Sequence, residues 1–136
     1  MTAKEYLLSV KSTSKSIVAL NAELKVIKSR KDGLKSIEIS EKVKSSITYS
    51  NLVDELIDQE EKVIRERKVL HNEWWVCRQY INQISDSDYR DVLRYYYLLN
   101  VKTWEMVAKK MHISERNLFR IHGGALEEFR KITGLL

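Results

Sequence analysis

Residues 89–126, YRDVLRYYYLLNVKTWEMVAKKMHISERNLFRIHGGAL, decide how the C-terminal part of the chain folds. The apolar positions of the stretch 102–112 recur at helical intervals. The tripeptide that follows predicts a tight link, because Ile113 can enter the core and Ser114 can cap the next helix. Together with the segment before it, this spacing predicts three short amphipathic helices, the last two arranged as a helix-turn-helix.

The helix expected from Ser114 onward has two different faces. One face gathers the apolar residues Leu118, Ile121, Ala125 and Phe129. The opposite face gathers Arg116, Phe119, Arg120 and Gly123. A short helix with one buried face and a basic, partly aromatic opposite face suits the major groove of DNA. The sequence therefore predicts a helix-turn-helix that binds double-stranded DNA.

The residues expected to contact base edges are Arg116, Asn117, Phe119 and Arg120. Arginine can hold guanine with two hydrogen bonds, and an aromatic ring can lie against a thymine methyl group. Asn117 could pair with adenine or could equally point towards the preceding turn. The alternative is an ordinary solvated face whose arginines pair with Glu115 and Glu127. An exposed Phe119 in a polar face favours DNA contact over that alternative.

The residues expected to contact phosphates are Lys102, Thr103, Lys109, Lys110, Ser114 and Gly123. Their role would be to position the protein without reading sequence, although solubility explains any single lysine equally well. Two glycines inside a helix, Gly123 and Gly124, each cost about 1 kcal/mol relative to alanine. Close approach of the backbone to phosphate or to a neighbouring helix would explain them, and so would a kink or a break.

Two longer segments precede this domain, and both carry heptad patterns typical of coiled coils. The seam positions of the first, expected to be helical from Thr2 to Asp32, include Val10, Ile17, Leu20, Leu24 and Ile27. Those of the second, from Tyr49 to Ile84, include Val53, Leu56, Val63, Leu70, Trp74 and Ile81. A flexible linker is expected over about residues 33–48, with a short strand at 35–39 as a weaker alternative.

The expected fold class is therefore all-α. Residues 1–84 are expected to form a helical hairpin or coiled-coil oligomerisation region, and residues 85–136 the three-helix DNA-binding domain. Ser85 and Asp88 have the spacing of a capping box at the start of the first helix of this domain. The two seams could close into an antiparallel hairpin, pair between subunits, or do both. A homo-oligomer, a dimer or higher, is expected from this pattern.

Composition excludes several other classes of protein. The 136 residues contain no proline and carry a net charge of +5. Residues 1–48 hold ten Lys/Arg against five Asp/Glu, residues 49–85 five against seven, and residues 86–136 nine against seven. No apolar run approaches the roughly 20 residues that cross a bilayer, and the single Cys77 fits a reducing cytoplasm. The three histidines lack metal-ligand spacing, and no nucleophile–base set is present. We expect no enzyme, no cofactor and no bound metal.

The same stretch resembles region 4 of bacterial sigma factors, and more closely the small late transcription regulators of phages and prophages of Gram-positive bacteria, of the ArpU and RinA type. The segments that carry the resemblance are YRDVL at 89–93, KTWEMVA at 102–108 and FRIHGGAL at 119–126. The opening TAKEYL and the later EKVKSS are also similar to that family. Gly124 departs from it, because the family usually has arginine there; a phosphate contact would then be missing.

The resemblance implies a phage-encoded activator of late genes that acts near a promoter with host RNA polymerase or a sigma factor. Two alternatives stay open from the residues alone. A DNA-packaging module like a small terminase subunit also couples a helix-turn-helix to oligomerising helices. A protein that binds RNA polymerase or a sigma factor without touching DNA would fit the acidic second helix.

Overall fold

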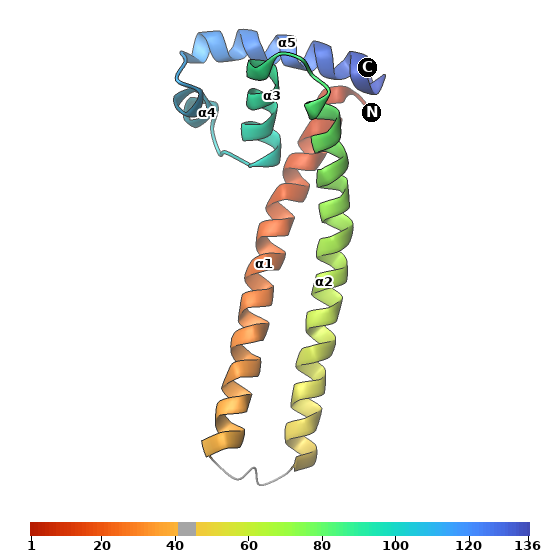
Figure 1. Cartoon of the computed structure of the whole chain (residues 1–136), viewed down its shortest axis with the longest axis vertical. Helices are drawn as coiled ribbons and strands as arrows, with labels where there is room; N and C mark the ends of the chain where they lie inside the picture. The colour runs from red at the N-terminus through yellow and green to blue at the C-terminus, as the bar shows by residue number, and fades with distance from the viewer. Residues whose placement is uncertain (41–45) are drawn as a thin grey trace. The chain divides into compact units, whose positions relative to one another are not determined.

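The computed structural model describes residues 1–40 and 46–136, and the side chains of 1–35 and 49–136. All regular structure in these residues is helical (Figure 1), so the expected all-α fold class is confirmed. The elements are α1 (Ala3–Ser40), α2 (Ser46–Asn82), α3 (Ser87–Leu93), the π-helical segment η1 (Arg94–Leu98), α4 (Trp104–Met111) and α5 (Glu115–Thr133).

The chain divides into two compact units, and both long helices run through both of them. Unit 1 comprises Met1–Ser16 and Leu70–Leu136, and unit 2 comprises Ile17–Val69. This division differs from the expected domain boundary at residue 85. The physical reason is that Leu7 on α1 and Ile81 on α2 are buried in the same apolar cluster as the C-terminal helices.

In unit 2, α1 and α2 run antiparallel along the heptad seam. Arg67 donates a hydrogen bond to Asn21 (3.0 Å), and Lys31 pairs with Glu60 (3.1 Å), so the two polar seam positions of α2 each bind α1. The expected apolar seam residues are the less exposed positions of both helices, and they are Ile17, Leu20, Leu24, Ile27, Val53, Leu56 and Val63.

The prediction of a flexible linker over about residues 33–48 is wrong at both ends. The α1 helix continues to Ser40 and α2 already begins at Ser46, so the proposed strand at 35–39 is helical as well; residues 41–45 lie outside the described residues. Gly33, the first residue of the expected linker, does not have the positive φ that ends a helix and lies within α1. One helical glycine costs only about 1 kcal/mol, and Leu34 beyond it lines an apolar groove with residues of α2.

Unit 1 is built around one continuous apolar core. In Figure 1, α5 lies across α3 and α4, and its buried face joins the core. The N-terminus of α3 is capped by Asp86, whose carboxylate accepts from the backbone N–H groups of Asp88 and Tyr89. The expected pairing of Ser85 with Asp88 is therefore off by one residue, since Asp86 itself reaches both free N–H groups.

The end of η1 is held by side chains from the two long helices. Lys11 Nζ donates to the carbonyl of Tyr96 (2.7 Å), Ser14 Oγ to that of Tyr97 (3.0 Å), and Trp74 Nε1 to that of Leu98 (3.0 Å). Carbonyls at the end of a helix have no partner within it. These three donors therefore fasten α1 and α2 to the C-terminal helices inside unit 1.

Loss of the Ser14 hydroxyl should destabilise unit 1. Ser14 is buried, and Ser14→Ala leaves the Tyr97 carbonyl without this donor, which should lower the free energy of unfolding by about 1–3 kcal/mol. The matched control is Ser9→Ala, because Ser9 is exposed and bonds only its own helix at the carbonyl of Tyr6. Urea unfolding of both variants measures the difference; equal effects would contradict the assigned role.

Candidate nucleic-acid interface

A three-residue link joins α4 to α5. The α4 helix starts after Thr103, whose hydroxyl accepts from the N–H of Met106 (3.2 Å), and it ends at His112, which has the left-handed backbone with φ 58°. Ser114 caps α5 by accepting from the N–H of Asn117 (3.2 Å). Ile113 between the caps packs against the core. The link therefore fixes where α5 begins relative to α4.

The α5 helix has the two faces expected from the sequence. Its buried residues are Leu118, Ile121, His122, Ala125 and Phe129. Its first half exposes Arg116, Phe119, Arg120 and Gly123. The α5 helix is continuous from Glu115 to Thr133, so it neither breaks nor separates at the two glycines.

The two arginines on this face differ in their surroundings. Arg116 is exposed and makes no hydrogen bond or ion pair with any residue that the structure describes. Arg120 donates through Nε (3.1 Å) and a terminal nitrogen (2.8 Å) to the amide oxygen of Asn117. The side chain of Asn117 is thus engaged along its own helix. Neither arginine pairs with Glu115 or Glu127, and Glu127 pairs instead with Arg130 (3.1 Å).

Phe119 has a structural support that the sequence did not reveal. Its ring meets Trp104 edge to face with 5.8 Å between centroids, yet 51% of the side chain remains exposed. Trp104 in turn stacks flat on Tyr96, with 3.7 Å between ring centroids. Packing therefore accounts for one edge of Phe119 and weakens the argument that only DNA contact explains this residue. The exposed half of the ring stays available to a partner.

The expected phosphate-contact residues lie at the surface, just before and along α4 and in the first half of α5 and its cap. Lys102, Lys109, Lys110 and Gly123 are exposed, and Thr103 and Ser114 are the exposed caps described above. Lys109 lies 3.5 Å from Glu105, and both side chains are largely solvated, so this ion pair holds it weakly. Residues 102–124 contain five Lys/Arg against two Asp/Glu, which makes this the basic part of the C-terminal half.

Gly124 is required by the contact between α3 and α5. A Cβ atom built at Gly124 would overlap the hydroxyl and ring of Tyr89, whereas one built at Gly123 would meet nothing within 4 Å. The two adjacent glycines therefore have different causes. The aromatic ring of Tyr89 fills the space that a larger residue at position 124 would need.

His122 is a buried histidine whose role the sequence left open. It is 9% exposed, and its Nε2 shares a 2.8 Å hydrogen bond with the hydroxyl of Tyr97. Burial, followed by the charge of Lys4, lowers the pKa of His122 to about 4. Burial also raises the pKa of Tyr97. Both side chains are therefore neutral at pH 7, and His122 supports α5 from the inside without carrying charge to a ligand.

The described residues offer no set of three His, Cys, Asp or Glu side chains that could hold a metal ion. Cys77 is fully buried, and burial raises the pKa of its thiol to about 12, so the thiol is an apolar core group at pH 7. None of the described helices is both long and apolar enough to cross a membrane.

Residues 39–130 match the family DUF1492, described as a protein of unknown function. The chain belongs to this family. The match covers α2 and all of the C-terminal helices up to the last turn of α5, so the geometry described above falls inside the region that defines DUF1492. No curated protein and no solved structure matched the chain.

The two glycines of this DUF1492 chain should respond oppositely to alanine. Gly123→Ala should stabilise the fold by about 0.5–1 kcal/mol, because it adds helix propensity without a clash. Gly124→Ala should destabilise it, since the methyl group displaces the ring of Tyr89. Thermal or urea unfolding measures both changes.

A double-mutant cycle tests the cause of the Gly124 effect. In a Tyr89→Ala background the clash is absent, so adding Gly124→Ala should raise the free energy of unfolding as it does at Gly123. If Gly124→Ala costs the same in both backgrounds, the contact with Tyr89 is not the reason for the glycine.

Acid should destabilise unit 1 through His122. Its folded pKa of about 4 lies below the ordinary 6.5, so the unfolded chain binds one more proton between these values. The free energy of unfolding should fall as the pH drops from 6.5 towards 4, by at most about 1.4 kcal/mol per pH unit. His122→Phe should remove this part of the pH dependence, whereas His71→Phe, at an exposed position, should leave it intact. Urea unfolding between pH 6.5 and pH 4 measures the free energy of unfolding. If its slope against pH is unchanged in His122→Phe, His122 is not the cause of the pH dependence.

Proposed function

We propose that this chain is a sequence-specific DNA-binding protein that regulates transcription. In this proposal α4 and α5 act as a helix-turn-helix, with the first half of α5 in the major groove and α4 across the sugar-phosphate backbone. The observation that carries the proposal is the exposed face of α5. There Arg116 makes no ion pair or hydrogen bond with the described residues, and Arg120 and Phe119 lie beside it.

The buried face of α5 favours a role of this helix in base recognition. Base readout needs side chains held to a fixed position, and the opposite face of α5 is fully packed at Leu118, Ala125 and Phe129. The aromatic ring of Trp104 supports Phe119 from α4. The helix itself is therefore a rigid platform, while the arginines that it presents are solvated.

The basic residues of α4 fit the role of backbone contacts. Lys102 and Lys110 are exposed and make no ion pair with the described residues, and Thr103 lies at the N-terminus of α4. Contacts of this kind supply affinity and orientation but no sequence information. Gly123 is exposed without a close neighbour, so a phosphate could approach the backbone there.

The resemblance to sigma region 4 and to the phage late regulators extends this proposal. It favours a phage-encoded activator of late genes that acts in the host cytoplasm near a promoter, together with RNA polymerase or a sigma factor. A homo-oligomer would bring two copies of α5 to one site and raise the affinity through bivalency.

One observation favours a second candidate, a protein partner in place of DNA. Three large apolar side chains are exposed in this region, Leu99 at 60%, Met106 at 44% and Phe119 at 51%. A surface of RNA polymerase or of a sigma factor could cover them. The two candidates differ in their dependence on salt and on the arginines.

The test is selection of bound fragments from genomic DNA, followed by affinity measurements against salt. The protein should enrich one site, and its affinity should fall steeply as salt rises. Arg116→Ala or Arg120→Ala should weaken specific binding about tenfold or more, since a bidentate contact with guanine contributes about 1–3 kcal/mol.

The control is Arg130→Ala, an exposed arginine on the same helix that pairs with Glu127 and lies beyond the first half of α5 that the proposal places in the groove. It should bind the selected site like the unsubstituted protein. Absence of any enriched site, with RNA polymerase or a sigma factor captured through Phe119 and Met106, would replace the DNA proposal by the second candidate.

A further inference from the structure

Unit 2 leaves much of its apolar surface uncovered. Among the residues of unit 2 with described side chains only Leu20 and Ile27 are buried, both on α1, and no described side chain of α2 in this unit is buried. Val26 is 49% exposed and Leu52 45% exposed. Two helices alone shield only one side of each seam, so a further layer of helix would remove these side chains from water.

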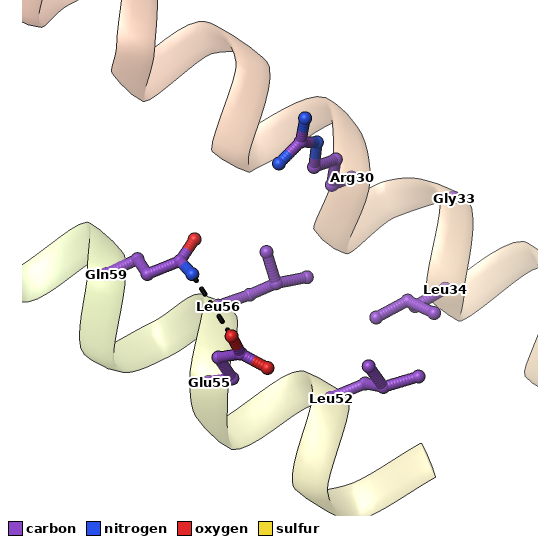
Figure 2. Close-up of a pocket in the computed structure, with 7 residues that line it drawn as sticks. All are labelled: Arg30, Gly33, Leu34, Leu52, Glu55, Leu56 and Gln59. Atoms are coloured by element: carbon purple, nitrogen blue, oxygen red, sulfur yellow. Dashed lines mark hydrogen bonds between the residues drawn. The ribbon is translucent and has the colours of Figure 1, made fainter. Parts of the chain in front are cut away.

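Two of these exposed side chains, Val26 and Leu52, line one groove between α1 and α2. Its two parts hold about 460 and 520 Å³ and share Arg30 and Gln59 as lining residues. In Figure 2, Leu34 of α1 and Leu52 of α2 point towards one another across the groove, while Arg30 points away from them. The floor is therefore apolar and the edges are polar.

The charges along the edges alternate in a self-complementary way. Along α1, Glu23 is followed one heptad later by Arg30, and along α2, Glu55 is followed one heptad later by Lys62. Because the helices are antiparallel, Glu23 lies across the groove from the end of α2 that carries Lys62, and Arg30 from the end that carries Glu55. At each of these two positions along the groove, one helix thus carries an anion and the other a cation.

We propose that a second copy of this chain covers the groove. The hairpin of the second copy lies face to face on the first, with α2 of each copy over α1 of the other, which makes a four-helix layer. This arrangement places Arg30 of each copy near Glu55 of the other and Glu23 near Lys62. It also buries Val26 and Leu52, the most exposed apolar side chains of the groove floor.

The edge charges favour a second copy over an unrelated partner. Two cations and two anions leave the edges with no net charge, so a uniformly acidic or basic partner gains nothing from them. The heptad seam is already occupied within one chain, as Asn21 with Arg67 and Lys31 with Glu60 indicate. Self-association therefore needs a different face, and the groove supplies it.

The experiment measures molecular mass by sedimentation equilibrium, without DNA, for the full chain and for two charge reversals. Arg30→Glu and Glu55→Arg should each be monomeric alone, because each homodimer contains two like-charge contacts. An equimolar mixture of the two should recover the dimer, since the mixed pair has opposite charges at both contacts.

Controls on the opposite flank of each helix carry the same charge changes. Lys28→Glu and Glu61→Arg are exposed and lie outside the groove, and both should remain dimeric. Circular dichroism checks that all variants keep their helix content. A monomeric unsubstituted protein at every concentration would overturn the proposal, as would a mixture that stays monomeric or controls that dissociate equally.

This inference does not rest on DNA binding, so the two proposals fail separately. Arg30→Glu should leave the fold of unit 1 unchanged while it removes bivalency, whereas Arg116→Ala should leave the dimer intact. A dimer that binds no DNA site would refute only the proposed function. A monomer that binds a DNA site would refute only the proposed dimer through the groove.

Discussion

The C-terminal helices depend on hydrogen-bond donors that come from the two long helices, α1 and α2. The carbonyls of Tyr96, Tyr97 and Leu98 end a helix, and their hydrogen bonds are buried (Tyr97) or partly buried (Tyr96 and Leu98), so an unpaired carbonyl there is costly. Lys11, Ser14 and Trp74 supply the hydrogen bonds, and Lys11 adds a positive charge at the negative end of the helix dipole. Partial burial, followed by the charge of Lys15, lowers the pKa of Lys11. The carbonyls that it binds offset that cost, so unit 1 needs both ends of the chain.

A chain of aromatic contacts carries this anchoring to the proposed recognition face. The ammonium group of Lys11 lies 3.8 Å from the centroid of the Tyr96 ring, and Tyr96 stacks on Trp104. Trp104 meets Phe119 at the surface of α5 and His122 on its inner side. The position of Phe119 thus depends on packing that begins on α1. Substitutions on α1 can therefore alter the position of Phe119 without touching α5.

The sequence predicted the helices and their faces better than their ends. Heptad spacing and the cap at Ser114 are local signals, and the structure places them as the pattern indicates. The continuation of α1 past Gly33 depends on side chains of α2, which no local signal contains. The donors Lys11 and Ser14 were missed because they bind residues more than 80 positions away. At the start of α1 the apolar stripe is wider than a heptad seam, because Leu7 lies beside the seam. This was the one sign in the sequence that α1 packs on two sides. Trp104 beneath Phe119 and Tyr89 beside Gly124 are likewise tertiary contacts.

The pairing of Arg120 with Asn117 bears directly on how α5 could read a base. Two of the donor groups of Arg120 are used on the amide oxygen, which leaves the rest of the guanidinium group directed outward. The exposed hydrogen bonds from Arg120 to Asn117 contribute only about 1 kcal/mol to stability. They also restrict the rotamers of Arg120 in the free protein, so less conformational entropy remains to be lost on binding. In the proposed complex with DNA, the cost of ordering Arg120 would thus be met partly in the free protein, whereas Arg116 would have to be ordered entirely by the DNA. The two arginines are therefore unequal, and Arg120 has the geometry of a preorganised contact.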